Sequence, residues 1–143
     1  LVSSPFVIDI FSYSNRYIEI FNEQNLIGRK VNYFHQIAAS ELFYKLKNYH
    51  FILIIQPDFA KDFISTKFYE ILYARVPIIY ISIDGLTKDF IRNHNAGFCL
   101  NFSEIYSFFS NSNFITNYDY NLRFNPKFYD LKNITENIYD FLK

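Results

Sequence analysis

The sequence predicts an α/β fold, a three-layer sandwich in which helices cover a parallel sheet of about five or six strands. Short runs rich in β-branched and aromatic residues alternate with segments whose apolar residues recur at helical spacing. Such strand–helix–strand repeats form right-handed parallel units. Two of the runs, "FILII" at 51–55 and "PIIYISI" at 77–83, are apolar without alternation, as expected of strands covered on both faces.

Five runs have the composition of β-strands and are bounded by turn-forming residues. In chain order they span residues 5–11, 30–34, 51–55, 77–83 and 97–101. Helical patterns lie between them at 15–24, 38–47, 65–75 and 86–95, and a short helix is expected at 102–110. A C-terminal helix is expected within 127–143, because apolar residues recur every three or four positions between 129 and 142.

Local signals define the ends of the third helix. Ser65 or Thr66 can cap its start, because a hydroxyl accepts a hydrogen bond from a free backbone N–H of the first turn. The helix must end by Arg75 or Val76, since the residue before Pro77 avoids the α-helical region.

Length and charge limit the classes of function. The chain has 143 residues, half of them hydrophobic, which is enough for the core of a single domain spanning 1–143. Its 14 basic and 14 acidic residues cancel and are scattered along the chain, which argues against nucleic acid as a partner. No apolar run approaches the roughly 20 residues of a membrane-spanning helix, so no transmembrane segment is expected.

Cysteine and histidine usage gives further expectations. A lone Cys99 and the lack of a leader-like start favour a reducing cytoplasm, with peripheral attachment to the inner membrane left open. The absence of methionine suggests a piece of a longer chain. His35, His50, His94 and Cys99 lack the spacing of metal ligands, so no metal site is expected.

The third helix has one apolar and one polar face. Its apolar stripe is expected to face the sheet and consists of Ile64, Phe68, Ile71 and Leu72. Lys67 and Glu70 lie on the other side, three residues apart, where they can pair with each other or serve a ligand. The helix start at Ser65 and Thr66 offers free N–H groups at the positive end of the dipole, a natural seat for a diphosphate that Lys67 could assist.

The stretch "STKFYEILYARVPIIYISIDG" at 65–85, with "DFIRNHNAGFCLN" at 89–101, resembles the donor-binding region of retaining glycosyltransferases of the GT-B fold, in the large group-1 or family-4 class. That pattern is approximately K-x-x-E-Y-L-A-x-x-x-P-V-I, then a turn, a helix and a short strand. The matching residues are Lys67, Glu70, Ile71, Leu72, Ala74, Pro77, Ile78, Ile79, Ile91 and Gly97. The resemblance covers roughly residues 31–101.

The resemblance implies a Rossmann-like domain that forms the nucleotide-sugar-binding half of a two-domain enzyme, with the acceptor-binding N-terminal half absent from this chain. In the family, the glutamate at the position of Glu70 accepts hydrogen bonds from the ribose hydroxyls of the donor. The first acid of the family's Glu-x7-Glu motif corresponds to Asp62, which is one methylene shorter and would touch the transferred sugar as the catalytic carboxylate.

Two further roles, and the expected reaction, follow from the same resemblance. The loop after the second strand, "FHQIA", would hold the base through His35, Gln36 and Ile37. The turn at Gly85 would face the sugar. The expected reaction moves a hexose-type sugar from a nucleoside diphosphate to an unknown acceptor hydroxyl in bacterial cell-surface polysaccharide synthesis, without a cofactor, and the chain alone is expected to be inactive.

One alternative stays open from the sequence. The chain could be a non-catalytic α/β binding or assembly module that keeps the fold without donor chemistry. Asp62 in place of glutamate, loops poor in glycine and a tail rich in aromatic residues at 114–129 favour this alternative.

Overall fold

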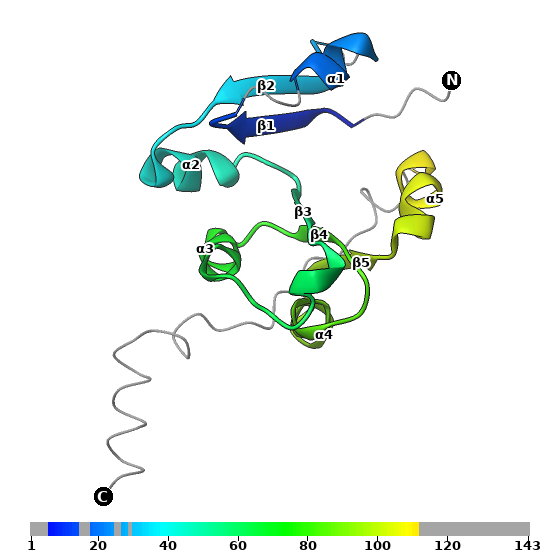
Figure 1. Ribbon diagram of the computed structural model, residues 1–143. Coiled ribbons are helices and arrows are strands. Elements are labelled where there is room, and N and C mark those ends of the chain that lie inside the picture. Colours follow the sequence, from blue (N-terminus) through cyan, green and yellow to red (C-terminus); the bar gives the residue numbers. More distant parts are fainter. Residues whose placement is uncertain (1–5, 15–17, 25–26, 29, 112–143) are drawn as a thin grey trace, which may run out of the picture.

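The computed structural model describes residues 6–14, 18–24, 27–28 and 30–111 (Figure 1). The helix expected within 127–143 lies outside these ranges. The helices, in chain order, are α1 (Ile18–Glu23), α2 (Ala39–Leu46), α3 (Thr66–Ala74), α4 (Leu86–Asn93) and α5 (Ile105–Ser110), with short 3-10 turns at Asp58–Ala60 and Phe102–Glu104. The strands are β1 (Ile8–Ser12), β2 (Val31–His35), β3 (Ile52–Ile55), β4 (Ile78–Ile81) and β5 (Gly97–Leu100).

All five described strands are paired in parallel, which confirms the predicted α/β class. They form two sheets, one of β1 and β2 and one in the order β3-β4-β5. The prediction of a single sheet of about five or six strands is therefore corrected. In Figure 1 the β1–β2 pair lies at the top of the view, apart from the other three strands.

Asp9 of β1 links the two-stranded sheet to the segment before β3. A carboxylate that loses part of its hydration on folding needs hydrogen-bond donors in its place. In the structure this carboxylate is half-buried and accepts hydrogen bonds from Asn32 Nδ2 at 2.8 Å and from the Tyr49 hydroxyl at 2.7 Å. Side chains from β2 and from the segment before β3 thus meet at Asp9.

The three-stranded sheet has a core on each face. On one face Phe68 and Leu72 of α3 and Ile91 of α4 pack against Ile78 and Tyr80 of β4. On the other face, partly buried residues of α5 pack against Ile79 and Ile81 of β4 and Leu100 of β5. Helices therefore cover β4 on both faces (Figure 1). The prediction of cover on both faces is wrong for β3, where Leu53 and Ile55 are 37% and 60% exposed.

The predicted apolar stripe and ends of the third helix are confirmed. Phe68 and Leu72 are 3% and 1% exposed. The Ser65 hydroxyl is the N-cap and accepts a hydrogen bond from the Phe68 N–H at 3.3 Å. The helix ends at Ala74, followed by Arg75 in the left-handed conformation, so the chain can turn before Pro77. Within the described ranges, no helix is both long and apolar enough to cross a membrane.

Replacing Gly97 with alanine is expected to lower the free energy of unfolding by about 2 kcal/mol or more. Gly97 has a φ of 150°, and a Cβ there would lie 1.9 Å from the carbonyl oxygen of Ile78, so β4 and β5 could not pair without moving apart. Gly28→Ala is the matched control, because Gly28 also has a positive φ but has open space around its Cβ position. Chemical denaturation of both variants measures the two free energies of unfolding. An equal decrease in Gly97→Ala and Gly28→Ala would contradict the steric explanation.

Tyr49→Phe is expected to change how stability depends on alkaline pH. Burial, followed by the hydrogen bond to Asp9 and the charge of that residue, raises the pKa of Tyr49 from 10.0 to about 12. Because the folded pKa is the higher one, the contribution of this group to stability is fully present below pH 10 and is lost as the pH rises towards 12.

At neutral pH, Tyr49→Phe should cost about 1 kcal/mol through the lost hydrogen bond. The difference from the wild-type protein should shrink between pH 10 and 12, as measured by denaturation at a series of pH values. A difference that is the same across this range would show that the pKa of Tyr49 is unchanged by folding.

Candidate functional site

The loop between β3 and α3 is held in place by hydrogen bonds from the half-buried Gln56 and the buried Thr87. Gln56 Nε2 donates hydrogen bonds to the carbonyl oxygens of Ala60 and Phe63. The Gln56 Oε1 in turn accepts one from the Tyr80 hydroxyl at 2.8 Å, and Thr87 Oγ1 of α4 donates to the Phe63 carbonyl at 3.2 Å. Burial raises the pKa of the Tyr80 hydroxyl, so it stays protonated as a donor. β4 and α4 therefore fix the shape of this loop.

The same loop touches the start of α4. The backbone N–H of Leu86 donates to the carbonyl oxygen of Lys61 at 3.0 Å. A Cβ at position 85 would lie 2.3 Å from that oxygen, so Gly85 is needed here for room. Asp62 follows Lys61 in the chain and is exposed. The structure thus brings the loop of Asp62 together with Gly85 at the carboxyl edge of the three-stranded sheet, where ligands of open α/β sheets bind.

The start of α3 lies at the same edge, because β3 leads into it. The hydroxyl of Ser65 is engaged in capping the helix, and Thr66 is the first helical residue. Lys67 and Glu70 are both exposed. The described ion pairs join Glu41 to Lys45, and Asp84 to Lys88 and Arg92, so the possible pairing of Lys67 with Glu70 is not formed.

The residues predicted to hold the base follow the other sheet. His35 ends β2, and Gln36 and Ile37 lie in the loop that leads to α2. His35 and Gln36 are exposed, and Ile37 is half-buried. Among the described residues, no hydrogen bond or ion pair joins them to Asp62 or Glu70. Their link to that region is indirect, through the packing of α2 against α3.

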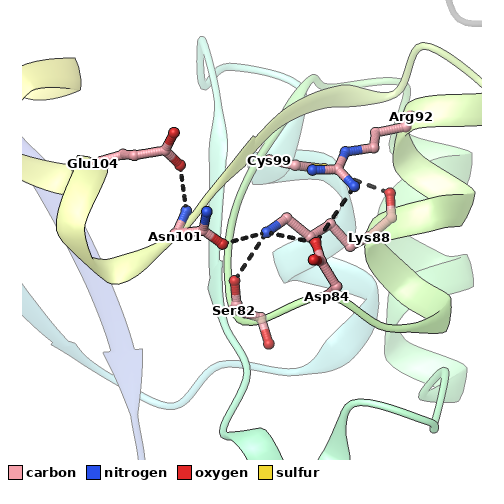
Figure 2. Close-up of polar contacts among 7 residues, drawn as sticks. All are labelled: Ser82, Asp84, Lys88, Arg92, Cys99, Asn101 and Glu104. Atoms are coloured by element: carbon pink, nitrogen blue, oxygen red, sulfur yellow. Dashed lines mark hydrogen bonds and ion pairs between the residues drawn. The ribbon is translucent and has the colours of Figure 1, made fainter.

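Lys88 is a residue of this edge that sequence reasoning missed. Its side chain is 1% exposed, although it belongs to the first turns of α4. Its ammonium donates to the Ser82 carbonyl at 3.2 Å and to Asn101 Oδ1 at 2.7 Å, and lies 3.3 Å from Asp84 Oδ1 (Figure 2). The three N–H donors of the ammonium thus have acceptors after β4 and after β5. The i,i+4 spacing of Asp84 and Lys88 was the available signal, but such pairs are common on exposed helices.

Asp84 is shared between two cations. Arg92 Nη1 lies 3.5 Å from Asp84 Oδ1, the same oxygen that contacts Lys88. The Asp84 side chain is 81% exposed and that of Arg92 is 53% exposed. A turn at the surface therefore places one carboxylate against a buried and an exposed cation (Figure 2).

Cys99 lies beside this cluster on β5. Its thiol donates to the backbone carbonyl of Lys88 at 3.6 Å. Burial raises the pKa of the Cys99 thiol to about 11, although Arg92 and Lys88 act in the opposite direction. At neutral pH the group is thus a thiol and not a nucleophilic thiolate. No group of three or more His, Cys, Asp or Glu that could hold a metal occurs in the part of the chain that the structure describes.

A hollow of about 360 Å³ lies elsewhere, between the end of β5 and α5. It is lined by Leu100, Glu104, Ser107, Phe108 and Asn111. None of the residues predicted for donor binding is among these. The candidate site is assigned to the carboxyl edge where the loop of Asp62 meets the turn of Gly85.

Comparison with family models, with curated proteins and with solved structures found no match to this chain.

Lys88→Met is expected to lower the free energy of unfolding by about 1–3 kcal/mol, because the buried carbonyl of Ser82 would lose its hydrogen-bond donor. The matched control is Lys45→Met, which removes a 45% exposed lysine from an i,i+4 pair with Glu41. The control should change stability by less than about 0.5 kcal/mol. Denaturant titration compares the two, and similar effects would mean that Lys88 does not hold the strand ends together.

Proposed function

We propose that this chain is the donor-binding part of a glycosyltransferase, a Rossmann-like half of a GT-B enzyme that takes its sugar from a nucleoside diphosphate. The enzyme would transfer the sugar to an acceptor hydroxyl in cell-surface polysaccharide synthesis. The observation that carries the proposal is the contact of the Asp62 loop with Gly85 at the edge where α3 also begins. The residues proposed for the sugar and for the diphosphate would then lie along one edge of the sheet.

Glu70 supports the proposal through its exposure and its freedom from Lys67. A ribose offers two vicinal hydroxyl donors, and an ionised carboxylate offers two acceptor oxygens. Such charge-assisted hydrogen bonds are about twice as strong as those between neutral groups. Glu70, one turn into α3, would hold the ribose near the helix start.

The loop that bears Asp62 supports a role in sugar binding because its shape is already fixed in the free protein. Its backbone carbonyls accept hydrogen bonds from Gln56, Thr87 and Leu86, so its carboxylate would need little ordering when a ligand binds. Asp62 would contact the transferred sugar, with the Gly85 turn beside it. His35, Gln36 and Ile37 would cover the base.

The leaving diphosphate needs positive charge. The start of α3 at Ser65, Thr66 and Lys67 would supply backbone N–H groups and one lysine, so that electrostatic stabilisation would not depend on a metal. Because the Ser65 hydroxyl already caps the helix, its backbone and not its side chain would face the phosphates.

One observation favours the alternative of a non-catalytic binding module. Phe59 and Phe63, on the loop of Asp62, are 92% and 63% exposed. Exposed aromatic side chains on a well-ordered loop suit contact with another protein surface. The two functions differ in a simple property, since a module without donor chemistry would not bind nucleotides.

Uridine and guanosine diphosphates are expected to bind the chain, with the preferred base identified by calorimetric titration. Glu70→Ala should weaken the binding of the preferred nucleotide about tenfold, through loss of a hydrogen-bonded charge. Glu23→Ala is the control. Glu23 is an exposed acid at the end of α1, so its replacement removes the same charge at a different place. Thermal melting verifies that both variants are folded.

Absence of binding by either nucleotide would contradict the proposal and support the binding module. Equal weakening by Glu70→Ala and Glu23→Ala would show that the overall charge, and not a ribose contact, determines affinity.

A further inference from the structure

The turn before α4 carries more positive than negative charge in direct contact. Lys88 and Arg92 both approach Asp84 Oδ1, at 3.3 and 3.5 Å. Among the described residues, Lys88 and Arg92 both form their ion pairs with Asp84. Two positive charges, one buried and one exposed, thus share one negative charge.

We propose that the space between Lys88 and Arg92 is a binding site for a phosphate group, and that Asp84 occupies this space when no phosphate is bound. The site goes beyond the proposed function, because its chemistry does not depend on a sugar. The phosphate could belong to free pyrophosphate or to the diphosphate of a nucleotide.

The burial of Lys88 supports a displaceable occupant. Its contacts with Ser82 and Asn101 satisfy two N–H donors with neutral oxygens, and a buried ammonium also needs a negative charge. Asp84 supplies that charge from a side chain that is 81% exposed and uses one oxygen for both cations. Because the Asp84 carboxylate is already largely hydrated, it can leave these ion pairs at little cost in solvation. Rotation of its side chain would then expose the Lys88 ammonium to an incoming anion.

A phosphate fits the two cations better than one carboxylate does. It carries up to two negative charges and three terminal acceptor oxygens, so that Lys88 and Arg92 need not share one oxygen. A guanidinium binds phosphate through two parallel N–H groups.

The start of α4 adds to the attraction. Gly85 precedes the helix and has no side chain to cap it, unlike Ser65 at the start of α3. The positive end of the helix dipole therefore points at the same turn. Asp89 and Glu104 are also near this region, but the described contacts of Glu104 are with the backbone of Asn101 and with Ser107.

Asp84→Asn tests the proposal, with Glu41→Gln as the matched control that neutralises an exposed acid in another i,i+4 pair. Calorimetry with inorganic pyrophosphate should show about tenfold tighter binding by Asp84→Asn than by wild type, since the competing carboxylate is gone. Glu41→Gln should bind like the wild type. Pyrophosphate should also raise the melting temperature of Asp84→Asn more than that of the control.

Arg92→Gln provides a second test in the wild-type background, in case Asp84→Asn folds poorly. It should weaken pyrophosphate binding about tenfold. The proposal would be overturned if Asp84→Asn did not raise the affinity for pyrophosphate, or if Glu41→Gln raised it equally. It would also be overturned if Arg92→Gln did not lower this affinity.

The source of the phosphate is distinguished by comparing pyrophosphate, uridine diphosphate and uridine. If the site holds a nucleotide diphosphate, Asp84→Asn will tighten uridine diphosphate and pyrophosphate alike and leave uridine unchanged. A gain for pyrophosphate alone assigns the site to the free anion. Glu70→Ala should not alter pyrophosphate binding, so failure of the ribose contact and failure of this site give different results.

Discussion

The buried ammonium of Lys88 is the constraint on which the carboxyl edge of the three-stranded sheet depends. A lysine almost never lies in a protein interior unless its charge and its N–H groups have partners. Lys88 finds them at the ends of two neighbouring strands, in the carbonyl of Ser82 and the amide oxygen of Asn101, and in Asp84 of the turn. The end of β4, the end of β5 and the start of α4 are thereby held in one arrangement.

A second set of contacts joins the β3 loop to this arrangement. Gln56, Tyr80 and Thr87 form a connected polar group, and the close approach of Lys61 to Gly85 completes it. The two helix starts at the edge nevertheless differ in chemistry. The start of α3 is capped by a hydroxyl and followed by an exposed lysine and an exposed glutamate, whereas the start of α4 has no capping side chain and two cations. In our proposals the start of α3 would serve the ribose and the diphosphate of a donor, and the turn before α4 would be a separate site for a phosphate group.

The order and boundaries of the elements could be predicted because they depend on local patterns. Short apolar runs, helical spacing of apolar residues, the capping serine and Pro77 are read within a few residues, and the predicted helix at 65–75 differs from α3 by one residue at each end. The division into two sheets could not be predicted in this way. Which strands pair is decided by contacts between residues that are distant in sequence, and local patterns do not record those contacts.

The candidate site was predictable to a similar extent. The resemblance assigned Asp62, Glu70 and Gly85 to one donor site, and the hydrogen bond from Leu86 to Lys61 brings the loop of Asp62 against the turn of Gly85. Lys88 has the sequence appearance of an exposed helical lysine, and its burial follows from the distant Asn101. The central claim is that this edge binds a nucleoside diphosphate. Amide chemical shifts measured during titration with uridine or guanosine diphosphate test it most directly: the account predicts the largest changes at 61–70 and 84–88, whereas no changes, or changes confined to the hollow around 104–111, would contradict it.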